Sequence, residues 1–143
     1  MKINDVLKAK PSTDVITITP DATVRDLLKL LAQHNVGALI VSTDGSTVDG
    51  IVSERDVVRQ LNEDEAVLSA PVQQIMTTDV ASCEGGDDVH ALMKLMTDRR
   101  IRHVPVVSHG KLSGVISIGD IVKHRIDELE FERDQLDNYV HQT

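Results

Sequence analysis

Apolar residues along the first half of the chain follow two spacings. Val24, Leu27 and Leu31 recur every three to four residues, as in a helix with one buried face. Thr23 precedes this run and Asp26 follows three residues later, which resembles a capping box and predicts a helix start. Shorter β-branched or apolar runs predict strands. The expected elements, in chain order, are strand 15–19, helix 23–35, strand 38–41, strand 50–52 and helix 53–61.

The second half of the chain repeats this pattern. Gly50-Ile-Val-Ser-Glu-Arg-Asp56 returns 64 residues later as Gly114-Val-Ile-Ser-Ile-Gly-Asp120. Further upstream, the helical run from Val24 aligns with the run from Val89, 65 residues later. The second copy predicts strand 80–83, helix 88–99, strand 103–107, strand 112–116 and helix 118–126. Since repeated sequence indicates repeated structure, we expect an α/β (α+β) fold of two β-α-β-β-α repeats.

The repeats divide the chain into four parts. These are an N-terminal segment (1–14), repeat one (15–66), repeat two (72–126) and a C-terminal helical tail (127–143). Each repeat has roughly 50 residues, too few for a comfortable core, so the two should pack as one unit. From the end of repeat two into the tail, apolar residues recur at helical steps: Ile126, Leu129, the stem of Arg133, Leu136 and Val140. This predicts an amphipathic helix, and two interpretations stay open: a dimer contact, or a solvated helix that frays.

Composition narrows the classes of function. The formal net charge is −8 and aromatic residues make up 1% of the chain, so the cations and stacking rings of nucleic-acid binders are scarce and no such partner is expected. Cys83 is the only cysteine, which excludes an intramolecular disulfide and favours a reducing, cytoplasmic location. No segment approaches the ~20 apolar residues that span a membrane. The histidine spacing matches no metal site.

The repeated Ser-x-x-Asp has a structural and a functional interpretation. Ser53 directly after a strand can cap a helix, with Asp56 bonding back to the Ser53 backbone. The same geometry leaves backbone N–H groups free at a helix start, where phosphate binds. A carboxylate one turn later can accept bonds from vicinal ribose hydroxyls. These roles together describe a ribonucleotide.

The pattern Gly-apolar-apolar-Ser-x-x-Asp resembles the nucleotide motif of CBS domains. Residues 15–126 as a whole resemble a tandem CBS pair, also called a Bateman module, with further similarity in Ser53-Glu-Arg-Asp-Val-Val-Arg59 and Arg100-Ile-Arg-His-Val-Pro-Val-Val107. The resemblance implies two repeats packed about a pseudo-twofold axis. It also implies a non-catalytic signal-transduction module that binds AMP, ADP, ATP or an NAD-like ligand and requires no cofactor. A homodimer and a separate protein effector are implied as well.

By the same resemblance, each site takes Ser-x-x-Asp from one repeat and base-holding strands from the other. One site then comprises Ser53, Arg55, Asp56, Val80, Ala81, Arg102 and His103. The other comprises Ser117, Gly119, Asp120, Ile16, Thr17, Gly37 and Ala38. The first set contains cations and the second contains none. Because charge-assisted bonds to phosphate are the stronger ones, we expect the Asp56 site to bind a phosphorylated ligand more tightly.

Other interpretations are open at this stage. Asp56 and Asp120 could be metal ligands or general bases of an enzyme, although no nucleophile and base pair and no Walker-type loop accompany them. The chain could instead be a dimeric scaffold with empty clefts. His103 could be a satisfied half-buried side chain, and Arg102 could pair with a surface acid. Cys83 is interpreted as a small core residue.

Overall fold

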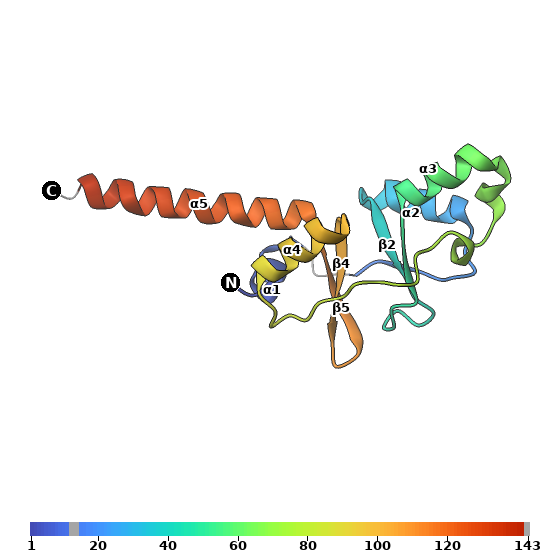
Figure 1. Ribbon diagram of the computed structural model, residues 1–143, viewed down its shortest axis with the longest axis horizontal. Coiled ribbons are helices and arrows are strands. Elements are labelled where there is room, and N and C mark those ends of the chain that lie inside the picture. Colours follow the sequence, from blue (N-terminus) through green and yellow to red (C-terminus); the bar gives the residue numbers. More distant parts are fainter. Residues whose placement is uncertain (12–14, 142–143) are drawn as a thin grey trace.

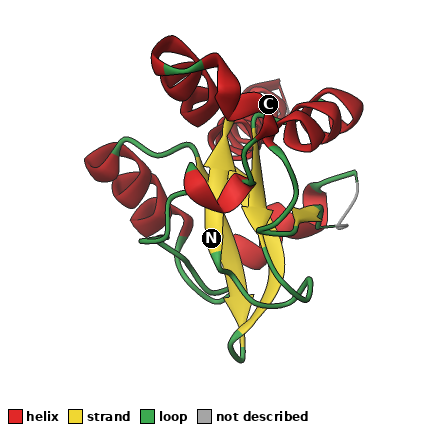
Figure 2. Ribbon diagram, turned by 90° about the vertical axis from the view of Figure 1, so that its right-hand side faces the viewer, coloured by secondary structure: helices red, strands yellow, loops and turns green. Residues whose placement is uncertain are grey.

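The computed structural model describes residues 1–11 and 15–141. Strands lie at the centre and helices surround them (Figure 1 and Figure 2). Parts of the predicted N-terminal segment (12–14) and tail (142–143) lie outside the described residues. The elements in chain order are α1 (Ile3–Ala9), β1 (Thr17–Ile18), α2 (Val24–His34), β2 (Ala38–Val41), β3 (Gly50–Ser53), α3 (Glu54–Glu63), η1 (Glu65–Ser69), η2 (Val72–Gln74), α4 (Val89–Arg99), β4 (His103–Ser108), β5 (Lys111–Ser117) and α5 (Ile118–His141).

The first sheet has the strand order β1-β2-β3. β1 runs parallel to β2, and β2 runs antiparallel to β3 with Ala38 opposite Ser53. Thr77 extends the β3 edge, since its N–H and C=O exchange hydrogen bonds of 2.8 and 2.9 Å with Ile51. The predicted strand 15–19 is present but shorter, because only Thr17 and Ile18 join the ladder.

The second sheet pairs β4 with β5 in antiparallel register, with His103 opposite Ser117. Its hairpin turns at His109 and Gly110, whose φ angles of 52° and 78° are those of a tight primed turn. The predicted strand 80–83 is wrong in extent. Within the described residues only Cys83 joins this sheet, through a parallel bridge to Val106. The first strand of repeat two is thus reduced to a single paired residue.

The predicted helix caps of repeat one are confirmed. Thr23 Oγ1 accepts from the Asp26 N–H, and the Asp26 carboxylate accepts from the Thr23 N–H, both at 3.1 Å. Asp88 takes the equivalent place before α4 and accepts from the His90 N–H at 3.4 Å. α2 ends at Asn35 in the left-handed conformation, with φ 52°. Local sequence therefore determines where these helices begin and end.

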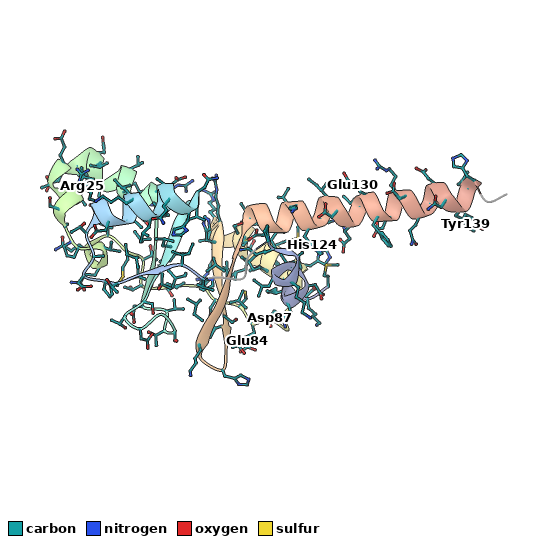
Figure 3. The ribbon with its side chains drawn as sticks, turned by 180° about the vertical axis from the view of Figure 1, so that it is seen from behind. Arg25, Glu84, Asp87, His124, Glu130 and Tyr139 are labelled. Carbon is teal, nitrogen blue, oxygen red and sulfur yellow. The ribbon has the colours of Figure 1, made fainter. Side chains whose placement is uncertain are left out.

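α5 continues without a break from repeat two into the tail. The helix predicted over 118–126 and the helical tail predicted after it form one helix of 24 residues, Ile118–His141, so the predicted helix end at 126 is wrong. Ile121 is buried and anchors its first turns. The C-terminal half extends away from the folded body, and Glu130 and Tyr139 lie clear of it (Figure 1 and Figure 3). No helix of the described chain is long and apolar enough to span a membrane.

Two hydrophobic clusters form the core. Each is built mainly from one repeat and also includes a segment that lies outside the α-β-β-α part of that repeat. The first cluster joins Leu27 and Val52 of repeat one to Val72 and Ile75 around η2. The second cluster joins the apolar residues of α4, β4 and β5 to Ile3 and Val6 of α1. The segment that precedes each repeat therefore packs on the other repeat.

Backbone hydrogen bonds hold these exchanged segments in equivalent positions. The Val89 N–H donates to Met1 O, and the Val24 N–H donates to Ala70 O, both at 3.0 Å. The predicted boundaries at 15–66 and 72–126 describe the repeated sequence, whereas the packing crosses them. Exchange of segments makes the two repeats one folding unit.

Gly50 and Gly114 are required by this exchange. A Cβ at Gly50 would lie 2.7 Å from Met76 Sδ and 2.9 Å from the Thr77 carbonyl oxygen. A Cβ at Gly114 would lie 2.9 Å from Leu7 Cδ2. In each repeat the motif glycine thus leaves room for the segment that crosses from the other repeat. The Ser and Asp that follow it lie where the strand joins the helix.

Candidate functional site

The first strand-to-helix junction connects β3 to α3 through Ser53 and Asp56. The Ser53 N–H and Oγ–H both donate to Asp56 Oδ2, at 2.9 and 3.1 Å. The Asp56 N–H donates to Ser53 Oγ at 3.3 Å. The predicted capping role is confirmed here, and both side chains are half-buried.

The second junction connects β5 to α5 and has two of the three internal bonds of the first. The Ser117 N–H donates to Asp120 Oδ2 at 2.9 Å, and the Asp120 N–H donates to Ser117 Oγ at 3.1 Å. Gly119 is exposed, and a Cβ there would meet only Ser117 Oγ at 3.6 Å. The two junctions are therefore alike in their own backbone and side-chain geometry.

Lys10 distinguishes the second junction from the first. Its Nζ lies 3.1 Å from Asp120 Oδ2 and donates to Val115 O at 2.8 Å. Both partners of this ion pair are largely covered, with side-chain exposures of 28% and 23%. The expectation that the second site has no cation is wrong. No local signal could show this, because Lys10 follows α1 and reaches repeat two only through the exchange of segments.

Arg102 and His103 also belong to the second junction. His103 pairs with Ser117 across the β4–β5 ladder, and the Ile118 N–H donates to Arg102 O at 2.8 Å. The sequence-based grouping placed both residues with Ser53 and Asp56. Their backbone lies beside Ser117, the serine of their own repeat, and their grouping with the first site stays a prediction.

Gly37 and Ala38 occupy the equivalent places in repeat one. Ala38 pairs with Ser53, and the Glu54 N–H donates to Gly37 O at 2.9 Å. These two residues were grouped with Ser117 and Asp120 from the sequence. The structure therefore places each strand start next to the junction of its own repeat, at positions that the duplication relates.

The two junctions meet where Gly37 faces His103. A Cβ at Gly37 would lie 3.7 Å from His103 Cε1 and 3.6 Å from Glu54 Oε1. Glu54 was not singled out from the sequence, although it directly follows the capping Ser53. Asp120 is also an electrostatic neighbour of His103. Residues of both repeats thus surround one imidazole, which makes the two half-sites adjacent.

The environment of His103 favours its neutral form. Burial lowers the pKa of the imidazole, and the nearby positive charges of Arg102 and Lys10 lower it further. The carboxylates of Asp120 and Glu54 act in the opposite direction without overcoming the burial. A neutral imidazole can donate one hydrogen bond and accept another.

The remaining predicted site residues lie on the segments that cross between the sheets. Thr17 pairs with Ile40, and Ile16 packs against the first hydrophobic cluster. Val80 and Ala81 are half-buried between Thr77, which pairs with β3, and Cys83, which pairs with β4. Among the described residues no hydrogen bond joins Val80 or Ala81 to Ser53 or Asp56.

The candidate site has no arrangement suited to metal binding or thiol chemistry among the described residues. No group of three His, Cys, Asp or Glu side chains suited to a metal ion occurs within residues 1–11 and 15–141. Burial raises the pKa of the Cys83 thiol to about 12, and its Sγ donates to Pro105 O at 3.7 Å. Cys83 is therefore a packed core residue, as predicted.

Comparison with known proteins agrees with the duplicated architecture. The CBS domain family model matches residues 3–63 and again residues 72–127. The chain belongs to the CBS-domain family. It is a CBS pair, and the family match in each repeat confirms the resemblance seen in the sequence. CBS-pair proteins are generally regulatory rather than catalytic.

Individual relatives extend over nearly the whole CBS pair. The mitochondrial CBS domain-containing protein CBSX3 of Arabidopsis thaliana is 36% identical over 96% of this chain and 71% of its own length. A solved structure of a protein with CBS domains from Burkholderia ambifaria is 41% identical, with a TM-score of 0.83 over 89% of this chain and 95% of that chain.

A more distant relative was solved with ligands. The CBS domain pair of protein MJ0100, in complex with 5′-methylthioadenosine and S-adenosyl-L-methionine, has a TM-score of 0.79. It covers 90% of this chain and 98% of that one at 22% identity, so the likeness shows the shared fold.

Proposed function

We propose that this CBS pair is a non-catalytic regulatory module that binds an adenosine nucleotide where its two strand-to-helix junctions meet. The observation that carries the proposal is the gathering of Asp120, Lys10 and His103 at a helix start that faces Gly37 of the other repeat. The adenosine ligands of the MJ0100 pair support the same ligand class. The candidates are AMP, ADP, ATP and NAD-like dinucleotides.

Each part of such a ligand has a matching group. The Asp120 carboxylate suits the vicinal hydroxyls of ribose, because one carboxylate accepts several hydrogen bonds. Lys10 already lies beside that carboxylate and can turn to phosphate, and His103 starts the adjacent strand directly after Arg102. The start of α5 adds backbone N–H groups and the positive end of its dipole. For the base we propose the half-buried residues Ile16, Thr17, Gly37 and Ala38.

The first junction would form the weaker site. Ser53 and Asp56 offer the same cap, with Arg55 in the first turn of α3, and for its base we propose Val80 and Ala81. The sequence-based expectation favoured Asp56 because it assigned Arg102 and His103 to that side. With Lys10 bonded to Asp120, we propose the reverse order of affinity for phosphorylated ligands.

Thermal unfolding with a ligand panel tests the proposal. Adenosine, AMP, ADP, ATP and NAD are compared with the matched guanosine compounds at a range of concentrations. A ligand present at a hundredfold over its Kd should stabilise the protein by about 2.7 kcal/mol. Absence of a shift with every adenosine compound would favour an empty-cleft scaffold. Release of phosphate from ATP in the presence of magnesium would favour an enzyme.

Matched variants locate the site. Asp120→Asn and Asp56→Asn keep the volume of each side chain and remove its charge. Titration calorimetry with the stabilising nucleotide should show the larger loss of affinity for Asp120→Asn. An equal or larger loss for Asp56→Asn would contradict the proposed order of the two sites.

The proposal includes how the signal is read. A ligand shifts a conformational equilibrium only through its different affinity for the two states. Because residues of both repeats surround His103, bound nucleotide would change how the repeats pack against one another. We further propose that a homodimer acts in the cytoplasm and that a separate effector protein recognises this change.

A further inference from the structure

Helix α5 carries an apolar stripe that the folded body does not cover. Val122, Ile126, Leu129 and Leu136 on α5 have exposed fractions between 46% and 66%. Positions 122, 126, 129, 133 and 136 are separated by alternating steps of four and three residues, and Val140 continues the series. That spacing is the seam of a coiled coil. Arg133 is the polar member of the seam.

The stripe is distinct from the face by which α5 joins the folded body. α5 packs on α1 and α4 near its start, where Ile121 is buried and Glu128 is half-buried. At about 100° per residue, the stripe lies on a different side of the helix, and Phe131 lies opposite to it. From Glu130 to His141 every residue is exposed, so the seam is accessible along its length.

We propose that this seam pairs antiparallel with the same helix of a second copy of the chain. Charge within the seam determines the orientation. In a parallel twofold pair each seam residue faces its own copy, so the two Arg133 guanidinium groups would lie against each other, which is unfavourable. In an antiparallel pair with its twofold axis at the level of Phe131, Arg133 faces Leu129 of the other copy, and Ile126 faces Leu136.

The charges beside the seam can be arranged in pairs in this orientation. Glu130 and Glu132 of both copies gather near the twofold axis, and the two Arg133 guanidinium groups lie there to offset part of their charge. Lys123 at the start of the helix would lie beside Asp137 of the other copy. Such flanking pairs determine orientation and partner choice in coiled coils. Arg125 is already engaged by Glu128 at 2.5 Å within the chain.

The shape of the molecule permits the pairing. The free end of each helix extends beyond the body (Figure 1 and Figure 3), so it can lie along the exposed side of the other helix, next to Val122 and Ile126. The two folded bodies then lie at opposite ends. The seam from Val122 to Val140 measures ~27 Å at 1.5 Å per residue. Since α5 is already nucleated by the folded body, the usual cost of starting a short helix does not apply.

Mass measurement of the full chain tests the pairing. Light scattering after size exclusion should give wild-type protein at no less than twice the chain mass of 15.7 kDa. Leu129→Glu with Leu136→Glu should halve the wild-type mass, while Phe131→Glu on the opposite side should leave it unchanged. Wild-type protein at 15.7 kDa, or a double variant that keeps the wild-type mass, would overturn the proposal.

Cysteine cross-linking tests the orientation separately. In a Cys83→Ala background, Ile126→Cys and Leu136→Cys chains are prepared alone and mixed. Oxidation should link the mixture into heterodimers and leave each chain alone mostly unlinked. Efficient linking of Ile126→Cys chains to one another would indicate a parallel pair and overturn the antiparallel arrangement.

Discussion

The junctions at Ser53–Asp56 and Ser117–Asp120 share two internal bonds and differ in their surroundings. In both, the serine N–H donates to the aspartate at 2.9 Å. Asp120 also has Lys10 at 3.1 Å and an adjoining strand that begins with His103, directly after Arg102. In repeat one the corresponding strand begins after Gly37 with Ala38. The two repeats therefore provide similar scaffolds, and the sequence differences between them change which cations lie beside each aspartate.

The largest expected effect concerns the glycines that admit the exchanged segments. Gly50→Ala should destabilise the protein by about 3 kcal/mol, since the new methyl meets the backbone oxygen of Thr77 at 2.9 Å. Gly114→Ala should cost only about 1 kcal/mol, because the Leu7 side chain at 2.9 Å can rotate away. Urea denaturation of the two variants measures the difference. Equal losses of unfolding free energy in the two variants would show that both packing sites accept an added methyl group equally well.

Removal of the half-buried cation Lys10 should distinguish the two junctions by their ligand affinity. Lys10→Met should weaken ATP binding by about 2 kcal/mol, the scale of a hydrogen bond to a charged group. Adenosine affinity should change much less, because adenosine has no phosphate. Arg55→Met is the matched change at the first junction and should have the smaller effect. Calorimetric titration of both variants with both ligands is the measurement, and a uniform loss for ATP and adenosine would contradict a phosphate role of Lys10.

Loss of either capping hydroxyl should have a moderate effect on stability. Ser53→Ala and Ser117→Ala each remove the acceptor of an aspartate N–H and should cost about 1 kcal/mol. Ser53→Ala should cost slightly more, because its hydroxyl also donates to Asp56 at 3.1 Å. Thermal unfolding without ligand measures this difference. A neutral result at both positions would show that the hydroxyls are retained for ligand rather than for capping.

The smallest expected effect is a pH dependence that only repeat two should have. Burial lowers the folded pKa of His103 below its ordinary value of 6.5. Below about pH 6.5 the unfolded chain therefore binds more protons at this histidine than the folded chain does. The free energy of unfolding that depends on neutral, buried His103 is complete above that pH and is lost as the pH falls below it. His103→Gln should flatten the fall in melting temperature between about pH 7.5 and about pH 5.5. An unchanged slope would show that other groups dominate it.

Local elements were largely predictable from the sequence because their signals are local. The capping pairs Thr23–Asp26 and Ser53–Asp56 form within three residues, and the apolar periodicity of α2 needs no tertiary contact to be recognised. The first strand of repeat two was overestimated, because only Cys83 finds a partner in β4. The helix predicted over 118–126 ends later than predicted, at His141. No helix-breaking residue occurs near residue 126, so the helix continues.

The candidate site was predictable in its motif and not in its partners. Ser-x-x-Asp is readable in both copies, and the strand starts that lie beside it could be singled out from the sequence. Which strand start serves which site stays a prediction, because backbone pairing places His103 beside Ser117 and Ala38 beside Ser53, while the His103 ring lies near Gly37. Lys10 gave no signal, since its bond to Val115 O joins residues that are 105 positions apart.

The duplication, the family, the helix caps and the two Ser-x-x-Asp motifs are readable in the chain alone, because each depends on residues close together along it. Which cation lies beside which aspartate, and which segment completes which hydrophobic cluster, follows from how the repeats pack. The reason is that α1 and η2 cross between the repeats, and the hydrophobic burial of Ile3 and Val72 brings Lys10 to Asp120 and Thr77 to β3. Contacts between a segment of one repeat and the core of the other produce no local sequence pattern in either repeat, so the sequence does not predict them.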